Sequence, residues 1–312
     1  MWLRKFCLRN NLKFGNLSGE SNDVDTNTVD QYRVNIQPLM RLYCDDQIFN
    51  VDETSLFYKL LPSKSYFFSK TEHFGGKLCK ERVTLMLCCS RSGNKELPVI
   101  VGNSKNPRWL RDNDLNNYEF DYDSSSSAWV TSQLFQRWLN KLHENLEEKN
   151  SNILLILDNF NGHHVNQSDY PRIKFEFLPP NTTSHLQPLD CGIIKSFKSK
   201  FASNLINHVY NEFKGGKKID QIKKEIKLNV AIKWVCKSWY EVQNETIVNC
   251  WRKSGLIQVN QVDELIVEEN IDQIVTNLTN LSIYIPDLPT HVEFLQQLSI
   301  NDSLFSTFDE LN

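Results

Sequence analysis

The spacing of apolar and polar residues along the chain predicts an α/β domain. Five short apolar runs are typical of strands, and they lie at 47–53, 82–89, 97–102, 153–157 and 173–178. In four other segments apolar residues recur every three or four positions, which predicts helices at 29–43, 134–146, 194–213 and 230–240. The run ILLIL at 153–157 is apolar throughout, as in strands that are buried on both faces.

The order of these elements predicts how they pack. Ser92, Gly93 and Asn94 stand between the second and third strands, where they favour a hairpin turn. The later strands alternate with helical or connecting segments, and strands joined in this way become parallel through right-handed crossovers. We therefore expect a mixed sheet with helices on both faces. The stretch 15–28 is rich in Gly, Ser, Asn and Asp, which is typical of a linker.

Composition changes this picture mainly through the distribution of charge. The 312 residues are 40% hydrophobic, with no apolar run near the roughly 20 residues that cross a bilayer. The net charge of −3 alone argues against a nucleic-acid partner, yet all 35 basic residues precede position 254, whereas ten of the 38 acidic residues follow it. A basic body with an acidic tail is expected of a protein that binds a polyanion, although a solvated tail without a role explains it equally well.

Three aspartates stand where a shared metal site is expected. Asp52 ends the first predicted strand, Asp158 ends the buried one, and Asp190 lies at the start of the long helix. If the two strands are parallel neighbours, their carboxylates project from one edge of the sheet, where such sheets place ligands. Converging carboxylates repel one another unless cations lie between them, and hard oxygen ligands select Mg²⁺ or Mn²⁺. Two such ions about 3.5–4 Å apart carry out phosphodiester chemistry without an organic cofactor.

Two of these aspartates also have a purely structural interpretation. Asp158 is followed by Asn159 and could form an Asx turn. Asp190 could cap its helix and interact favourably with the helix dipole. The sequence leaves these alternatives open.

Several longer motifs resemble one family of transposases. Three strings are similar, in this order, to the catalytic blocks of the pogo/Tigger group of mariner-like transposases: IFNVDETSLFYKLLPSKSY (48–66), ILLILDNFNGHH (153–164) and FLPPNTTSHLQPLDCGIIKSFKSKF (177–201). The string VIVGNSKNPRWL (99–110) is similar to a segment between the first two blocks. The resemblance runs from about residue 2 to about residue 255 and extends to centromere protein B and the jerky proteins.

The resemblance implies an RNase H-like fold, with a DDE-type endonuclease and strand-transfer domain at 29–255. It places the family's metal triad on Asp52, Asp158 and Asp190, and it implies two Mg²⁺ or Mn²⁺ ions, DNA as the partner and the nucleus as the location. Residues 2–20 are similar to the end of the family's helix-turn-helix DNA-binding domain. We therefore expect 1–28 to be a remnant of that domain with its linker, and 256–312 to be an acidic tail. A homodimer is the assembly considered, and no membrane partner is expected.

Further residues near these motifs are candidates for supporting roles. Glu53 is next to Asp52, and His163 and His164 follow Asp158 closely enough to reach a phosphate or a metal-bound water. The alternative for each is an ordinary place in a strand or turn. Basic residues on a loop and on the long helix are candidates for contacts with DNA phosphates, with solvated surface positions as the alternative: Lys105, Arg108, Lys195, Lys198 and Lys200.

The function predicted in this way is metal-dependent cleavage and joining of DNA. Two other hypotheses stay open. One is a domesticated DNA-binding protein that keeps the fold without cutting. The other is a scaffold that binds a partner through its acidic tail.

Overall fold

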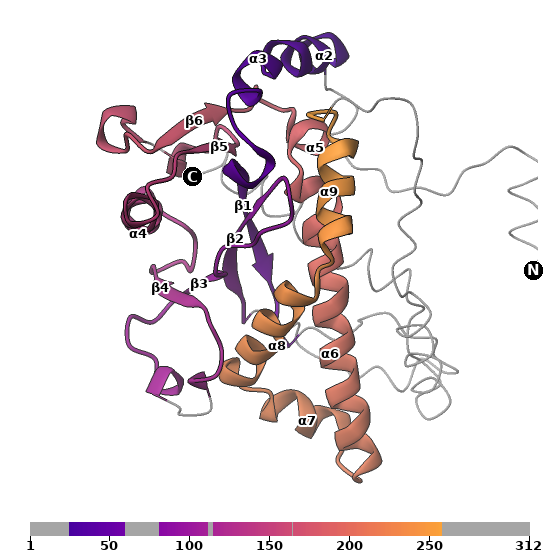
Figure 1. The fold of residues 1–312 in the computed structure, drawn as a ribbon. Coiled ribbons are helices and arrows are strands. Elements are labelled where there is room, and N and C mark those ends of the chain that lie inside the picture. The colour runs from indigo at the N-terminus through magenta and orange to yellow at the C-terminus, as the bar shows by residue number, and fades with distance from the viewer. Residues whose placement is uncertain (1–24, 60–80, 112–114, 164, 258–312) are drawn as a thin grey trace, which may run out of the picture.

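A computed structural model of the chain describes residues 25–59, 81–111, 115–163 and 165–257. Its centre is a six-stranded sheet with the strand order β4-β3-β2-β1-β5-β6 (Figure 1). β2 runs antiparallel to both of its neighbours, whereas all other neighbouring strands of the sheet are parallel. The strands are β1 (Ile48–Leu56), β2 (Val83–Ser90), β3 (Val99–Gly102), β4 (Asp121–Ser124), β5 (Ile153–Leu157) and β6 (Ile173–Phe177).

Alternation of side chains along the strands divides the sheet into two apolar faces. In β1, Ile48 and Leu56 belong to one buried cluster, and Phe49 and Val51 belong to the other. All five residues of β5 are buried, as its uninterrupted apolar run predicts. This alternation puts Asp52 and Glu53, which are neighbours in β1, on opposite faces of the sheet.

Helix α4 (Ser132–Glu148) covers the face that carries Phe49 and Val51. The Oγ1 atom of Thr131 accepts a hydrogen bond from the backbone N–H of Leu134 at 3.3 Å and so caps the start of the helix. The buried side of α4 is the one that its apolar spacing predicts, with Leu134, Phe135, Trp138, Leu139, Leu142 and Leu146.

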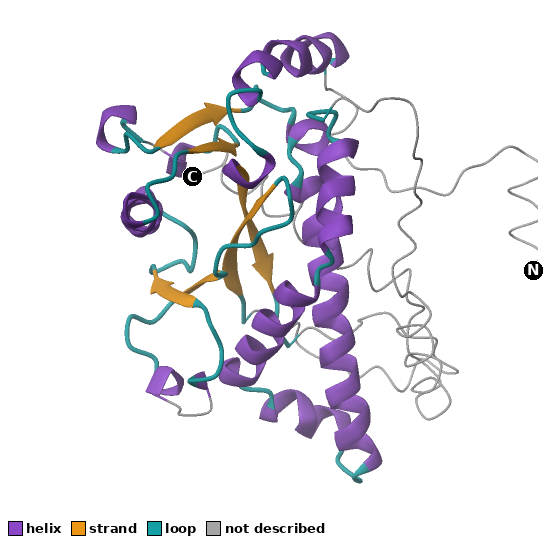
Figure 2. Cartoon of the chain, in the orientation of Figure 1, coloured by secondary structure: helices purple, strands orange, loops and turns teal. Residues whose placement is uncertain are grey.

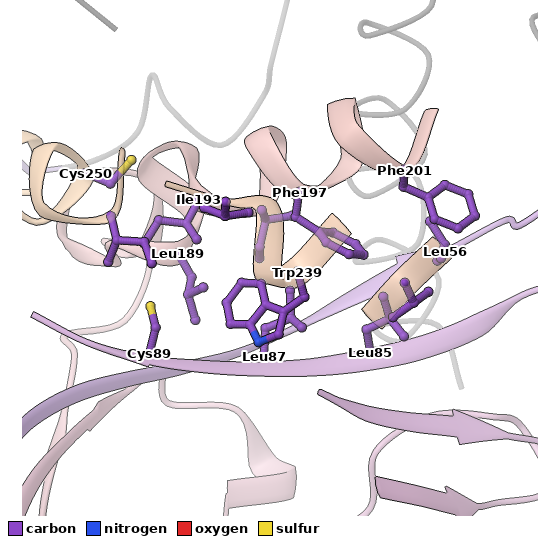
Figure 3. Close-up of a cluster of buried hydrophobic side chains, with 14 of the residues drawn as sticks. Leu56, Leu85, Leu87, Cys89, Leu189, Ile193, Phe197, Phe201, Trp239 and Cys250 are labelled. Carbon is purple, nitrogen blue, oxygen red and sulfur yellow. The ribbon is translucent and has the colours of Figure 1, made fainter. Parts of the chain in front are cut away.

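The opposite face is covered by α6 (Ile194–Lys214), α8 (Leu228–Glu241) and α9 (Asn244–Lys253), as Figure 2 shows. Phe197 of α6 and Trp239 of α8 lie over Leu85 and Leu87 of β2 (Figure 3). Because helices pack on both faces, the mixed sheet covered by helices that the sequence predicted is confirmed.

The remaining described elements are short helices and turns. They are α2 (Thr26–Asn35), α3 (Gln37–Met40), α5 (Thr183–Leu186), α7 (Ile219–Glu225), the 3₁₀ turns η1 (Asp45–Gln47), η3 (Arg108–Arg111), η5 (Asn161–His163) and η6 (Gln167–Asp169), and the π-helical turn η7 (Leu189–Ile193). No helix of the described ranges is both long and apolar enough to cross a membrane.

The structure corrects the expected elements at three places. The predicted helix 29–43 is two helices, because Pro38 has no N–H to continue the first one. The first of them begins at Thr26, inside the predicted linker, where Asp25 accepts a hydrogen bond from Asn27 N. β4 was not predicted, because its sequence DYDS has no apolar pattern and it is held by backbone pairing with β3. Most of the predicted segment 1–28, and the acidic tail beyond position 257, lie outside the described residues.

Candidate active site

Asp52 lies in the middle of its strand rather than at its end. It is the fifth of the nine residues of β1, which continues to Leu56 because the later residues pair with β2. In the parallel pairing with β5, Asn50 is opposite Ile156. The parallel pairing ends there, and two positions further along each segment the same register leads to Asp52 and to Asp158, which directly follows β5. The parallel neighbourhood on which the shared site depends is therefore present.

Asp190 lies on the π-helical turn η7, immediately before the long helix α6. The N-cap of α6 is Ile193, so Asp190 does not cap that helix as the alternative interpretation supposed. The turn is kinked at Gly192, whose φ of +152° is rare for residues with a side chain. A Cβ atom at this position would lie 3.0 Å from Cys250 Sγ of α9, so the close approach of the two segments also favours glycine.

Two hydrogen bonds, one to Leu189 and one to Cys191, hold this turn against the rest of the molecule. The buried amide of Asn50 donates from Nδ2 to the Ile156 carbonyl at 3.0 Å, and its Oδ1 accepts from Leu189 N at 3.0 Å. Lys253 Nζ donates to the carbonyl oxygen of Cys191 at 2.8 Å. These contacts flank Asp190 on both sides. One asparagine thus connects β1, β5 and the turn that carries the third aspartate.

A buried histidine connects Asp158 to Glu53. The Nδ1 atom of His163 lies 2.7 Å from Asp158 Oδ1, and its Nε2 lies 3.0 Å from Glu53 Oε1. Its ring packs against Phe135 of α4 with a centroid separation of 4.4 Å. Burial alone would lower the pKa of His163, but the charge of Glu53 and the hydrogen bonds to both carboxylates raise it to about 10. At neutral pH this residue is therefore an imidazolium cation between two carboxylates.

Asp158 also forms the Asx turn that its neighbouring Asn159 suggested. Its Oδ1 accepts a hydrogen bond from Phe160 N at 3.3 Å. This turn and the contact with His163 both orient the carboxylate, whose side chain is 24% exposed. The structural role of Asp158 therefore coexists with its place beside Asp52.

Asp52 is the electrostatic centre of the site. Burial raises the pKa of Asp52 well above its usual range, and the negative charges of Asp190, Glu53 and Asp158 raise it further. The side-chain amide of Gln187 opposes this effect by lying close enough to lower the pKa of Asp52. These influences place all four carboxylates in one electrostatic neighbourhood. Such a concentration of negative charge favours a cation.

Gln187 is a buried polar residue whose amide has no conventional hydrogen bond. It is 1% exposed, and within the described ranges neither Nε2 nor Oε1 has a partner in normal hydrogen-bond geometry. An unpaired buried amide costs about 1–3 kcal/mol, and the interaction of this amide with Asp52, which lowers the pKa of Asp52, offsets part of that cost. Its position beside Asp52 gives the site both a carbonyl oxygen and an N–H donor.

The site offers oxygen ligands that suit a divalent metal ion, although their side chains are not arranged around one common point. Among the described residues, no three His, Cys, Asp or Glu side chains are arranged to hold a metal ion. Asp52 is buried, Asp190 is exposed and Asp158 is engaged by His163. The donor set nevertheless fits a hard divalent cation, because it consists of carboxylate and amide oxygens with an excess of negative charge.

The basic residues that the sequence singled out divide into exposed and buried ones. Lys105, Arg108 and Lys195 are exposed, and Lys200 is partly exposed. Lys198 is only 5% exposed, because it lies on the side of α6 that packs onto the sheet. It does not suit a phosphate contact, and we remove it from the candidate DNA surface. His164 lies outside the described residues.

Three residues of the site were not singled out from the sequence. Asn50, Gln187 and Lys253 act through partners that are distant in the chain, as in the bond between Asn50 and Leu189 across 139 positions. The one available signal was a polar residue within an otherwise apolar strand, which Asn50 provides in IFNVDE. Gln187 and Lys253 carried no comparable signal.

Comparisons with known proteins agree with these features. The family described as DDE superfamily endonuclease matches residues 80–251. CENP-B homolog protein 2 of Schizosaccharomyces pombe is 31% identical over an alignment of 274 residues that covers 83% of this chain and 51% of that protein. Tigger transposable element-derived protein 4 of Mus musculus is 27% identical over a gapped alignment of 314 residues that covers 99% of this chain and 57% of that protein.

The chain thus spans about half the length of the curated relatives that it matches. Among solved structures, the Mos1 transposase paired-end complex with left transposon end is similar, with 12% sequence identity and a TM-score of 0.39. That similarity covers 81% of this chain and 70% of the Mos1 chain.

Proposed function

Because the chain belongs to the DDE superfamily endonucleases, as a pogo/Tigger-type relative of CENP-B and jerky proteins, we propose that it is a metal-dependent DNA endonuclease. In this proposal it cleaves phosphodiester bonds and joins the resulting ends to other DNA. Its location is then the nucleus, and a homodimer is the assembly to test.

The observation that carries the proposal is the convergence of three aspartates from distant parts of the chain. The proposal is supported by the parallel register of β1 and β5, which leads two residues beyond Asn50 and Ile156 to Asp52 and Asp158. Asn50 bonds the turn that carries Asp190 to the same two strands. The negative charges of Asp190 and Asp158 both act on Asp52. A structural role for each aspartate alone would not require this common neighbourhood.

In the proposed site, Asp52, Asp158 and Asp190 hold two Mg²⁺ or Mn²⁺ ions. Such ions activate a water or a 3′-hydroxyl and stabilise the leaving oxygen of an in-line displacement. Glu53 and His163 orient Asp158 from the far side, and Gln187 offers its amide to the reacting groups. Basic residues before and in η3 and on α6 would contact the DNA backbone, namely Lys105, Arg108 and Lys195, which are exposed, and Lys200, which is partly exposed.

The test is the nicking of supercoiled plasmid DNA by the purified protein in Mg²⁺ or Mn²⁺. Asp158→Asn should reduce the nicking rate by about 10²–10³, as expected when one group that stabilises transition-state charge is lost. Asp169→Asn is the matched control, because Asp169 is an exposed aspartate of η6 outside the site. We expect this variant to nick like the wild type. Equal nicking by Asp158→Asn would reveal a contaminating nuclease and defeat the proposal.

A second function is favoured by one feature of the site. His163 already pairs with both Asp158 and Glu53, and the described residues hold no group of His, Cys, Asp or Glu side chains arranged for a metal ion. A domesticated protein that binds DNA without cutting would have these properties. Folded wild-type protein that retains DNA in EDTA but does not nick it with either ion would support this function and overturn the nuclease.

A further inference from the structure

A cleft with a volume of about 690 Å³ lies beyond the C-terminal ends of β1 and β3. Tyr58 and Lys59 follow β1, and Asn103 and Ser104 follow β3. The end of α7, the start of α8 and the turn between them also line it, together with η3. The cleft has the size of a pocket for one small ligand. It is too small to admit a DNA duplex.

The cleft carries an excess of positive charge. Arg108, Lys224 and Lys227 line it and are exposed, and none of them makes an ion pair or side-chain hydrogen bond with the described part of the chain. Of the described residues that line the cleft, Glu81 is the one acid, and Lys59 Nζ neutralises it at 2.8 Å. Three cations around a concave surface favour an anion such as a phosphate group.

The same cleft has an aromatic wall. Trp109 and Tyr122 meet edge to face, with ring centroids 5.0 Å apart and an angle of 88° between the rings. Both rings are only partly buried. The hydroxyl of Tyr122 donates to the carbonyl of Ser104 at 2.6 Å, which fixes that ring. Rigid aromatic surfaces beside cations are the usual elements of sites that stack a base and bind its phosphate.

The position of the cleft relates it to the three aspartates. Because β1 leads from Asp52 towards Tyr58, six residues at about 3.3 Å each separate the site from the cleft by about 20 Å. β3 is parallel to β1 through the antiparallel β2, so both strands end at the same edge of the sheet. One DNA strand a few nucleotides long can therefore span the two places.

We infer that this cleft binds an unpaired nucleotide of the DNA strand that passes the aspartates. The inference rests on the proposed function for its ligand, which is DNA, and adds where and how one strand is held. The base stacks in the aromatic wall, and Arg108, Lys224 and Lys227 contact the phosphates on either side. A paired base would not enter, because its two faces are covered by its neighbours in the duplex.

The experiment measures the binding of fluorescein-labelled 20-nucleotide DNA by anisotropy in EDTA. The DNA is a single strand, a blunt duplex, or a duplex with a single-stranded overhang. Trp109→Ala should weaken binding of the single strand and of the overhang by about five- to a hundredfold, as expected for one lost stacking contact. The double variant Lys224→Gln/Lys227→Gln should reduce the salt slope by about 1.4, for two lost phosphate contacts. Binding of the blunt duplex should change less.

Lys237→Gln is the matched control, because Lys237 is an exposed lysine of α8 outside the cleft. Trp109→Phe keeps an aromatic ring and should retain most of the affinity, which separates stacking from misfolding. Unchanged single-strand binding by both the tryptophan and the double-lysine variants would overturn the inference. So would an equal loss for the blunt duplex, or displacement of the strand by micromolar dAMP, which would indicate a site for a free nucleotide.

Failure of this inference can be distinguished from failure of the proposed function. Binding is measured without metal and can be repeated in the Asp158→Asn background. If the protein is a nuclease without this nucleotide site, the wild type will nick plasmid DNA and Trp109→Ala will bind single-stranded DNA as tightly as the wild type. A protein with the nucleotide site but no nuclease activity would show the reverse.

Discussion

At the scale of single residues, His163 is a buried ionisable side chain that lies between two carboxylates. Its side chain is fully buried and meets a carboxylate at each ring nitrogen. A buried cation is tolerated only when it is paired and hydrogen-bonded. Here Glu53, which is 110 positions away in the chain, and Asp158, which is five positions away, meet both conditions. Its charge also reduces the repulsion between Glu53 and Asp158.

This arrangement predicts a specific dependence of stability on pH. The pKa of His163 is raised from 6.5 to about 10, so the folded protein binds the extra proton more tightly than the unfolded chain does. The stabilisation is complete below pH 6.5 and is lost as the pH rises towards 10. In EDTA, the free energy of unfolding of the wild type should fall over this interval by on the order of 3 kcal/mol more than that of His163→Gln.

Urea unfolding at pH 6, 7, 8, 9 and 10 measures this difference. His208→Gln controls for the loss of a histidine that packs on Trp234 without bridging two acids. Parallel pH curves for the wild type and His163→Gln would show that the imidazole is not a cation in the folded protein.

At the scale of secondary-structure elements, the turn η7 determines where Asp190 lies. Its backbone departs from a regular helix at Gly192, and the residues on either side of Asp190, Leu189 and Cys191, are bonded to Asn50 and Lys253. Leu189 and Ile193 of the turn pack on the sheet beside Cys89 (Figure 3). Specific hydrogen bonds and packing contacts therefore hold this π-helical turn at the start of α6. Such turns are frequent at functional sites.

Replacement of Gly192 by alanine tests how firmly the turn is held. The new Cβ would be strained at φ +152° and would lie 3.0 Å from Cys250 Sγ. We expect a loss of about 1–3 kcal/mol in the free energy of unfolding. Gly216→Ala is the control, because Gly216 also has a positive φ of +91° but nothing within 4 Å of its Cβ position. If the two variants lose equal stability in urea, the crowding against α9 has no energetic weight.

Some helices and strands could be predicted from the sequence, and others could not. β1, β2, β5, α4 and α8 could be predicted because burial imposes an apolar pattern on them. β4 could not, since a polar edge strand depends on pairing with β3. The three aspartates were found from motifs and from parallel strands. The kink at Gly192 and the pairing of His163 with Glu53 depend on contacts that no local pattern records.

At the scale of the whole molecule, the fold brings several carboxylates close to one another, although their mutual repulsion destabilises the folded protein. Burial and the charges of Asp190, Glu53 and Asp158 raise the pKa of Asp52, so the ionised form of Asp52 lowers the stability of the folded protein as the pH rises. A divalent cation would remove this penalty. The site is thus assembled at a cost in stability that ligand binding can recover.

Calorimetry with and without divalent ions tests this balance. At a hundredfold excess over the dissociation constant, Mg²⁺ or Mn²⁺ should raise the melting temperature of the wild type by on the order of 5 °C or more. Asp52→Asn should melt higher than the wild type in EDTA, because it removes a repelled carboxylate, and should respond less to the ions. Asp169→Asn should behave like the wild type in both conditions. Equal responses of Asp52→Asn and the wild type would place ion binding elsewhere.

The central position of β1 has a practical consequence for anyone who expresses part of this protein. The region that matches the endonuclease family, 80–251, starts after β1 and stops before Lys253. A fragment trimmed to those limits would lose the strand between β2 and β5, together with Asp52 and the amide that tethers the turn of Asp190. Fragment boundaries drawn from similarity alone would remove the middle of the sheet. Boundaries that respect strand order begin before β1.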